Sequence, residues 1–280
     1  MRRQTKRQIL QRSAKKSRSE RDGGKPQCII HTAEEIEGIR QAAATTSAIL
    51  ETILAGIGPG VALNDLDLLA GAVMRDHSVD SAFKGYLGFP GEICISVNDE
   101  VVHGISCRDR IIQLGDIVSV DCGTRCGGYI GDTAKTVSVG PAVGQVANLM
   151  AVTEKSLMAG IDVARAGNTV WDIGVAIENV VSASGYKVVR DFVGHGCGVK
   201  LHEAPEVPNY PTAKSREPLY AGMVLALEPM VNVGDHRVKI DDDGWTVRTI
   251  DGSWSAHFEH MILITESKPE ILTWPKNASN

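Results

Sequence analysis

The sequence has 280 residues, of which 43% are hydrophobic and 22% are charged, and its six cysteines form no CxxC pair. This length can bury a sizeable core in one large domain, and the composition is typical of soluble globular proteins. The cysteine spacing argues against a zinc ribbon or a disulfide framework. The longest apolar runs fall far short of the ~20 residues that a membrane-spanning helix needs.

Positive charge is concentrated at the start of the chain. Residues 1–25 contain ten Lys or Arg and two acids, whereas the whole chain has a net charge of −5, so the remainder carries −13. This segment has too few apolar residues to pack a core, and we expect residues 1–28 to be a basic, mobile extension of a single domain, residues 29–280. A solvated tail, a weak nucleic-acid contact and an organelle transit peptide all fit this composition, whereas the segment lacks the apolar stretch of a secretory signal.

Helix signals begin after the extension. Thr32 and Glu35 form a capping box, and apolar residues then recur at helical spacing until Gly58-Pro59-Gly60 ends the helix. Asn64 is placed to cap a second helix. Strand-like segments rich in β-branched residues follow at 92–97, 116–121 and 134–139.

The second half of the chain repeats this order. A helix is expected from Pro141-Ala142 to about Val163, and Thr169 is placed to cap another. Strand-like segments follow at 223–228 and 260–265. Each half therefore reads as two helices followed by strands.

The strands of the two halves align residue by residue. The segment 115–121, GDIVSVD, matches the segment 222–228, GMVLALE, and each ends on a carboxylate. Each is followed by a strand that starts beside another acid and is preceded by an isolated histidine: Asp132 and Glu259, and His103 and His202. We infer two similar α+β halves that face each other, with acids converging at the seam, where a repeat-built domain places a site.

Two of these acids raise a question by themselves. If residues 117–121 and the segment that begins near Ile130 form a hairpin with its tight turn at Cys126-Gly127, Asp121 and Asp132 are directly opposed. Like charges at opposed positions destabilise a strand pair. Either one side chain points to water or the register differs, or a cation lies between them.

The whole set of acids favours the cation. Four buried carboxylates cannot all ionise without a compensating charge, and two divalent ions roughly 3.5–4 Å apart supply it. His195, in Gly-His-Gly, is the expected imidazole ligand, with a hydrogen-bonded core histidine as the alternative. Oxygen-rich ligation with one imidazole favours Mn(II), Fe(II) or Co(II), and Zn(II) competes on affinity.

Other hydrolase and nucleotide-binding motifs are absent from the sequence. His202-Glu203 does not begin a zinc-binding HExxH motif, because position 206 is Glu. There is no P-loop, since GGYIGDT lacks the lysine, and no GxSxG nucleophile elbow.

Six segments carry a specific resemblance: GYLGFPGEICISVNDEVVHGI, GDIVSVDCG, GYIGDTAKT, GHGCGVKLHEAP, LALEPM and WSAHFEHMI. Over residues 29–266 the chain resembles the type I methionine aminopeptidases of metallopeptidase family M24. The resemblance implies an α+β pita-bread (creatinase/aminopeptidase) fold, in which two pseudo-symmetric halves pack helices on a curved antiparallel sheet. It also implies that residues 29–280 are a single catalytic domain.

The resemblance assigns roles position by position. It implies five metal ligands, Asp121, Asp132, His195, Glu228 and Glu259. It implies that His103, His202 and Glu228 are catalytic and that the substrate contacts His103, His202, Tyr86, Phe89, Cys94 and Trp245. Phe83 stands where relatives often have Cys, and Leu201 where they often have Phe, which leaves the shape of the methionine pocket open. Cys122 and Cys126 are interpreted as packing residues, with a redox pair as the alternative.

The implied activity is co-translational removal of the initiator methionine from proteins whose second residue is small, by peptide hydrolysis at two divalent metal ions. The expected partners are N-terminal Met peptides and nascent chains, and possible ribosome contact is assigned to basic residues 1–25. We expect a cytoplasmic monomer with no membrane contact. Two alternatives stay open: a non-catalytic relative that binds peptides, ribosomes or nucleosomes, and a proline-specific peptidase, which normally carries an extra N-terminal domain.

Overall fold

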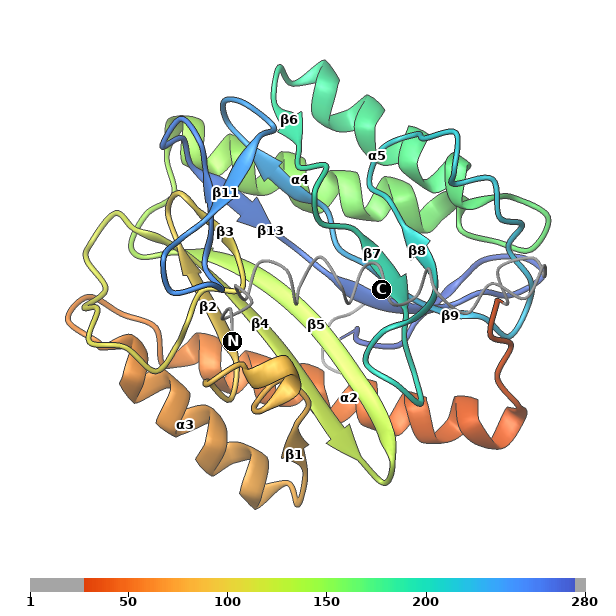
Figure 1. The fold of residues 1–280 in the computed structure, drawn as a ribbon, viewed down its shortest axis with the longest axis horizontal. Helices are drawn as coiled ribbons and strands as arrows, with labels where there is room; N and C mark the ends of the chain where they lie inside the picture. Colours follow the sequence, from red (N-terminus) through yellow and green to blue (C-terminus); the bar gives the residue numbers. More distant parts are fainter. Residues whose placement is uncertain (1–27, 275–280) are drawn as a thin grey trace, which may run out of the picture.

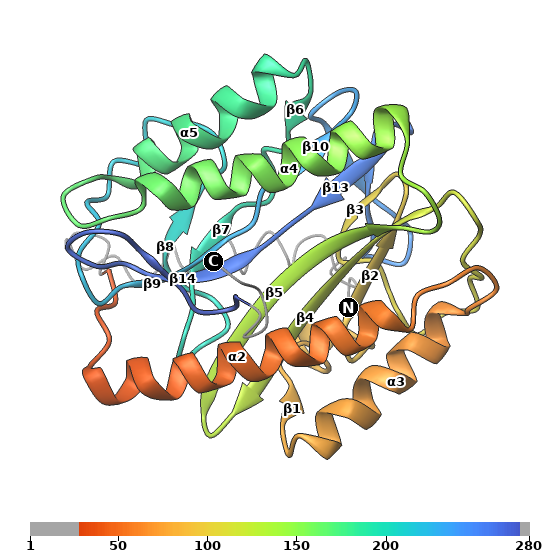
Figure 2. The ribbon, with the colours of Figure 1, turned by 180° about the vertical axis from the view of Figure 1, so that it is seen from behind.

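Two pairs of helices lie on opposite sides of a set of curved antiparallel sheets (Figures 1 and 2). The computed structural model describes residues 28–274; the predicted basic extension lies outside this range, and so do residues 275–280. The helices are α2 (Ala33–Ala55), α3 (Leu63–Asp76), α4 (Gly144–Val163), α5 (Val170–Ala183) and the short 3-10 helix η1 (Tyr86–Gly88). Helices α2 and α3 precede the strands of the first half and α4 and α5 those of the second, as the repeat predicts.

The strands form four sheets, in the orders β1-β4-β2 with β5 paired to β4, β13-β10-β6, β11-β12-β3 and β15-β14-β9-β7-β8. In chain order they are β1 (Asp80–Ser81), β2 (Cys94–Val97), β3 (Glu100–Val102), β4 (Ile117–Cys126), β5 (Tyr129–Ser138), β6 (Lys187–Val188), β7 (Gly194–Gly196), β8 (Glu203–Val207), β9 (Val224–Leu227), β10 (Met230–Asn232), β11 (Val238–Ile240), β12 (Val247–Thr249), β13 (Ser255–His257), β14 (His260–Leu263) and β15 (Glu270–Ile271). The predicted α+β pita-bread class is confirmed.

The helix starts test the predicted caps. The box at Thr32 is present: its backbone N–H donates to Glu35 and its side chain accepts from the Glu35 N–H. At the start of α5 the backbone N–H and the hydroxyl of Thr169 both donate to Asp172 Oδ2, at 2.8 and 2.7 Å. The cap predicted at Asn64 is wrong, because α3 begins at Leu63, two residues before the start that a cap at Asn64 would give. The cap residue is Ala62, and the Leu63 N–H donates to the Arg110 carbonyl at 2.9 Å. A neighbouring loop thus supplies the acceptor that a side-chain cap would provide.

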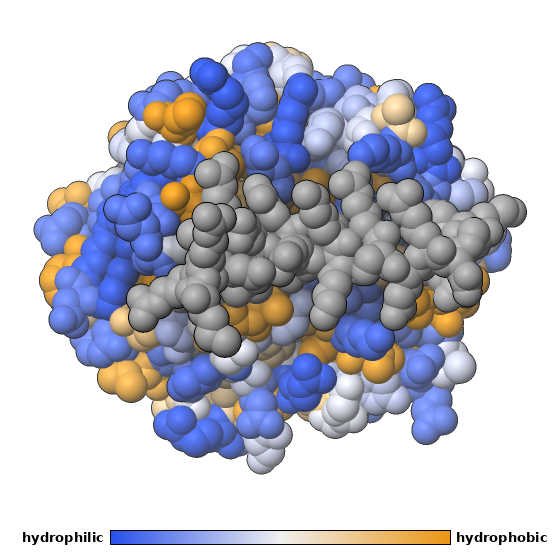
Figure 3. Space-filling view, in the orientation of Figure 1, coloured by the Kyte–Doolittle hydropathy of each residue, from blue (hydrophilic) through white to orange (hydrophobic). Residues whose placement is uncertain are grey.

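The core follows the two helix layers. Helix α2 packs on β4 and β5, and α4 packs on β9, β10 and β13. Cys122 is buried in the cluster that α3 and β4 form and Cys126 packs against it, with both thiols free, which supports the packing interpretation. Polar side chains predominate on the face in Figure 3, and no helix within residues 28–274 is long and apolar enough to cross a bilayer.

The register of the β4–β5 hairpin corrects the predicted one. Cys126 pairs with Tyr129, so the turn is Gly127-Gly128, with φ of 58° and 90°. A two-residue turn of this kind needs positive φ at both central positions, which glycines adopt without strain and Cys126 would not. As a result Asp121 pairs with Ala134 and Asp132 with Gly123. The two aspartates still share one face of the hairpin, as diagonal rather than opposed neighbours.

Close packing of α2 on β5 depends on Gly131. A Cβ at this position would overlap the Thr46 hydroxyl and lie 2.5 Å from the Ala42 carbonyl oxygen, both on α2. We expect Gly131→Ala to lower the free energy of unfolding by about 1–3 kcal/mol, the usual cost of overpacking. Gly58→Ala is the control, because a Cβ there meets nothing within 4 Å, and its effect should stay within about 0.5 kcal/mol. Equal urea midpoints for the two variants would contradict this account.

Candidate metal centre

Strands from both halves bring the predicted acids to one place. Asp121 and Asp132 come from β4 and β5, Glu228 directly follows β9, and Glu259 lies between β13 and β14. His195 is the central residue of β7 and pairs with Ala226 of β9. The seam predicted from the repeat is therefore present in the structure.

The ligand atoms are close to one another. One side-chain atom each of Asp132, His195 and Glu259 lies within 4.8 Å of the others. His195 Nε2 lies 3.9 Å from Asp132 Oδ2 and 3.4 Å from Glu228 Oε1. Asp121 faces the same group from the neighbouring strand, because it shares the hairpin face of Asp132. The structure thus gathers all five predicted ligands.

The His195 ring is oriented for ligation. Its Nδ1 lies 2.9 Å from the Gly196 carbonyl, so the Nδ1–H donates there and Nε2 presents a lone pair to the acids. Burial, together with the neighbouring His202, lowers the pKa of His195 to about 3. The ring is therefore neutral at physiological pH, as a metal ligand must be.

The carboxylates occupy an unfavourable electrostatic environment. Burial raises the pKa of Asp121 to about 7. Burial and then the neighbouring carboxylates raise the pKa values of Asp132, Glu228 and Glu259 well above the usual range. Among the described residues no lysine or arginine forms an ion pair with any of the four.

Several buried oxygens in this group also lack hydrogen-bond donors. Asp121 Oδ1, Asp132 Oδ1 and Glu259 Oε1 are buried and have no partner within residues 28–274. Buried polar atoms are rarely left in this state. A divalent cation supplies both the missing charge and the missing partners, and carboxylate oxygens with one imidazole are a suitable donor set. The residues present therefore fit a metal centre.

Two further predicted histidines border the acids. The His202 ring lies 4.4 Å from that of His195, and its Nδ1 is 2.8 Å from the Tyr86 hydroxyl. His103 has a positive φ of 57° and packs edge-on against Phe192 at 5.2 Å. Burial, and then His202, lowers the pKa of His103 to about 4. Strained backbone of this kind is found preferentially at functional sites.

The sequence interpretation missed one residue of the site. His257 is buried on β13, and its Nε2 lies 3.7 Å from Glu228 Oε2. Burial and the neighbouring His103 lower the pKa of His257 to about 3. Strand alternation could have found it, because a residue two positions before Glu259 in an extended segment points to the same side.

The predicted pocket residues fall into two groups. Phe89, Cys94 and Trp245 share one buried apolar cluster, and the Phe89 and Trp245 rings meet edge-on at 5.2 Å. Cys94 is the strand partner of Asp121, which places the cluster beside the acids. Tyr86 lies apart, 39% exposed, with its hydroxyl on His202.

The two departures from the family pattern belong to the same apolar cluster. Phe83 and Leu201 are both buried in it. A Cβ on Gly123 would overlap the Phe83 ring, so the ring packs directly on β4 at the strand partner of Asp132. The Phe83 ring therefore lies next to the face of the β4–β5 hairpin that carries Asp121 and Asp132.

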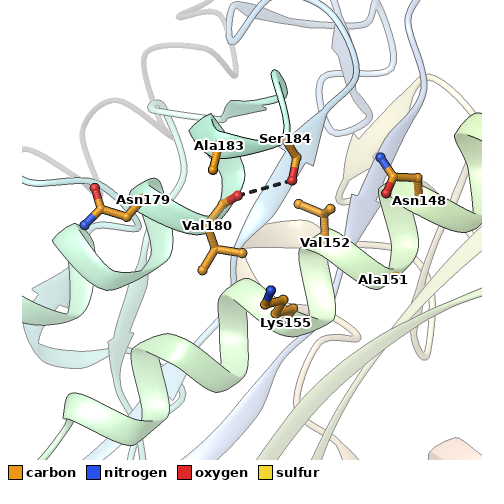
Figure 4. A pocket seen from close by; sticks show the side chains of 8 residues that line it. All are labelled: Asn148, Ala151, Val152, Lys155, Asn179, Val180, Ala183 and Ser184. Atoms are coloured by element: carbon orange, nitrogen blue, oxygen red, sulfur yellow. Dashed lines mark hydrogen bonds between the residues drawn. The ribbon is translucent and has the colours of Figure 1, made fainter.

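A separate hollow lies between helices α4 and α5 (Figure 4). Asn148, Lys155, Asn179 and Ser184 contribute to its lining, and the Ser184 hydroxyl donates to the Val180 carbonyl at 3.4 Å. None of the predicted site residues lines it, so the seam is the better candidate for the chemistry.

Comparisons with known proteins agree with this geometry. Residues 37–266 match metallopeptidase family M24. A methionine aminopeptidase from Clostridium acetobutylicum is 45% identical over 245 residues, which cover 88% of this chain and 98% of the relative. The chain belongs to metallopeptidase family M24. The resemblance inferred from the sequence is thereby confirmed.

Solved structures also match. A methionine aminopeptidase from Thermotoga maritima superposes with a TM-score of 0.86 at 42% identity and covers 88% of this chain and 99% of its own. A prolidase from Pyrococcus furiosus has a TM-score of 0.72 at 22% identity, and 66% of its chain is covered. The second match shows the shared fold alone. An M24 metallopeptidase uses a divalent metal, in agreement with the buried acids.

The pKa shifts predict a metal-dependent response to pH. Carboxylates whose pKa is raised in the folded state contribute stability below their unfolded pKa of about 4, and this contribution is lost as pH rises through the folded value. With Asp121 at about 7, this loss falls mainly between pH 4 and pH 7, and its upper part lies between pH 6.5 and pH 8, where metal-free protein should lose thermal stability. The buried histidines add little in this window, because their lowered pKa values matter only near and below their unfolded value of about 6.5.

Thermal unfolding with chelator and with Mn(II) at both pH values tests this response. We expect the midpoint to fall with chelator and to stay level, or rise, with Mn(II), because bound cations stabilise the ionised ligands. Asp132→Asn removes one of the buried charges and should reduce the fall in the metal-free protein. Parallel pH profiles with and without metal would show that these acids do not hold the ion.

Proposed function

We propose that the chain removes the initiator methionine from proteins whose second residue is small, at a centre of two divalent ions that Asp121, Asp132, His195, Glu228 and Glu259 hold. The oxygen-rich donor set favours Mn(II), Fe(II) or Co(II), with Zn(II) as a competitor. When bound, such ions polarise a carbonyl group and lower the pKa of water. The observation that carries the proposal is the group of four acids, three of which have a buried oxygen without a hydrogen-bond partner and none of which pairs with a lysine or arginine among the described residues.

Glu228 is the proposed proton carrier. Its two carboxylate oxygens face different imidazoles, His195 at 3.4 Å and His257 at 3.7 Å. Burial, and then Asp121, raises the pKa of this carboxyl well above its usual range, which favours proton uptake by a group that must accept and return a proton. In this role Glu228 takes a proton from the attacking water and delivers it to the leaving amine.

His202 and His103 are the proposed substrate contacts. His202 lies at the edge of the acids, where its ring N–H can donate to the scissile carbonyl oxygen as negative charge develops. Tyr86 holds the opposite ring nitrogen at 2.8 Å and so orients the donor. His103, on the same side as His202, contacts the peptide near the scissile nitrogen.

The apolar cluster beside Asp121 is the proposed methionine pocket. Phe89 and Trp245 provide aromatic surfaces and Cys94 a polarisable sulfur, which suit a thioether side chain. The free amine of the substrate lies toward the acids, which limits cleavage to the first residue. We assign the preference for a small second residue to the crowding of the site by His103 and His202.

A pair of peptides tests the activity. Mn(II)- or Co(II)-loaded protein should release free methionine from Met-Ala-Ser and leave Met-Lys-Ser nearly intact, because the larger side chain does not fit. Chromatographic detection of methionine is the measurement. Hydrolysis of neither peptide with any of several divalent ions would overturn the enzyme assignment and favour a peptide-binding relative.

Two variants separate the proton carrier from the carbonyl donor. Glu228→Gln should lower kcat at least ~10²-fold, the usual loss for a general acid–base group, and should also weaken metal binding. His202→Ala should lower kcat by about 10²–10³-fold, as for one oxyanion donor, with full metal content. Elemental analysis of both variants is the control, and a metal-free His202→Ala protein would make His202 a ligand instead.

The basic segment is the proposed ribosome contact of a cytoplasmic, monomeric enzyme. It lies outside the described residues, and the proposal rests on its ten basic residues in residues 1–25 beside a body of net charge −13. A polycation binds phosphate-rich RNA through counterion release, which weakens steeply with salt. Deletion of residues 1–25 should leave kcat/KM on Met-Ala-Ser unchanged and reduce co-sedimentation with ribosomes at low salt. Equal pelleting of both proteins would exclude this contact.

A further inference from the structure

A second buried contact between an acid and a histidine lies outside the metal centre, where the chain enters helix α2. His31 Nε2 lies 3.2 Å from Glu203 Oε2, and the two side chains are only 1% and 2% exposed. Neither residue is among the predicted ligands or catalytic groups. Glu203 directly follows His202, so the contact joins the segment before α2 to the loop that carries the carbonyl donor.

The second oxygen of Glu203 organises that loop. Glu203 Oε1 accepts from the backbone N–H groups of Val199 and Lys200, at 3.0 and 2.7 Å. Residues 197–202 form neither helix nor strand, so these two bonds to the Glu203 carboxylate are what hold the loop in a defined conformation. Burial alone would raise the pKa of Glu203, but the His31 side chain and the loop N–H groups lower it overall, which keeps the carboxylate ionised.

His31 is itself held rigidly. Its backbone N–H donates to the Gly222 carbonyl at 3.0 Å, and the next residue, Thr32, caps α2. A Cβ on Gly198 would come within 2.9 Å of the His31 ring, so the ring lies directly against the loop backbone. The Gly198 carbonyl in turn accepts from the Ile130 N–H of β5 at 2.7 Å. The histidine therefore connects a long helix to the loop without an intervening side chain.

The His202 side chain needs this backbone support. It is exposed, and its only hydrogen bond to a side chain of the described residues is the one to the Tyr86 hydroxyl. We propose that His31 and Glu203 are positioning residues, a buried clamp that holds the loop 197–202 so that the His202 ring faces the substrate carbonyl. This inference rests on the role proposed above for His202.

Loss of one partner should disrupt the clamp. Removal of His31 leaves the buried Glu203 carboxylate without its side-chain partner, which is strongly unfavourable. Glu203 would then turn toward water and release the N–H groups of Val199 and Lys200. Residues 197–202 would then adopt several conformations, and His202 would spend less time in the orientation that favours the transition state.

A double-mutant cycle tests the clamp. His31→Ala is made in the wild type and in His202→Ala, and kcat and KM on Met-Ala-Ser are measured with metal content matched. We expect His31→Ala to lower kcat by about 10-fold in the wild type, with KM nearly constant, and by less than about 2-fold when His202 is already absent. Equal losses in both backgrounds, or no loss in either, would overturn the proposal. Wild-type activity in the same assay reports separately on the proposed function.

Three further variants distinguish positioning from general damage. His31→Lys supplies Glu203 with a side-chain N–H donor and should recover most of kcat. Glu203→Gln enters the same cycle as an independent variant if His31→Ala fails to fold. Arg40→Ala is the matched control, because it removes ion pairs of the following helix α2, to Glu270 at 2.7 Å and to Glu37, that do not involve residues 197–203. A kcat loss with Arg40→Ala as large as that with His31→Ala would also overturn the clamp.

Discussion

The burial of four carboxylates without a protein cation is the constraint on which the rest of this structure depends. Asp132 and Glu259 are 3% and 2% exposed, and the apolar strands around them exclude the water that would otherwise solvate the charge. The cost of ionising such a group is several kcal/mol for each ion in a protein interior. The group is therefore stable only when protonated or when cations bind it, and the scaffold must hold it in place in both states.

Backbone groups provide that support. The Glu259 N–H donates to the Ala134 carbonyl at 2.8 Å, and the Glu259 carbonyl accepts from the Thr133 hydroxyl at the same distance. These bonds join the two halves of the molecule beside the acids. On the other side, the Asn209 amide donates to the Glu228 carbonyl at 3.1 Å. These bonds fix the main chain of the two glutamates and leave their carboxylate oxygens free to bind the ions.

The sequence predicted the acids because their signal is local. A carboxylate six positions after a glycine, repeated in the two halves, identifies Asp121 and Glu228 without knowledge of any contact, although β4 continues past Asp121 to Cys126. The predicted register of the β4–β5 hairpin was wrong because it depends on the position of one turn. Glycines at both 127 and 128 place that turn one residue later than predicted. His257 and the His31–Glu203 contact were missed because each is defined by a partner distant in the sequence, and no periodicity encodes such a pairing.

The buried acids of this chain fall into two classes: those with a structural role and those proposed to bind metal. Glu100, fully buried three residues before His103, accepts from Arg110 and Arg248 at 2.8 and 2.7 Å. Glu203, directly after His202, faces His31. Both histidines proposed to contact substrate thus lie beside a buried acid whose partner is supplied by the protein, and such an acid can fix a loop permanently. The acids of the seam pair with no lysine or arginine in the part of the chain that the structure describes. The histidines that face Glu228 have pKa values lowered to about 3 and are neutral at physiological pH, so the charge of these acids is left for a metal ion to balance.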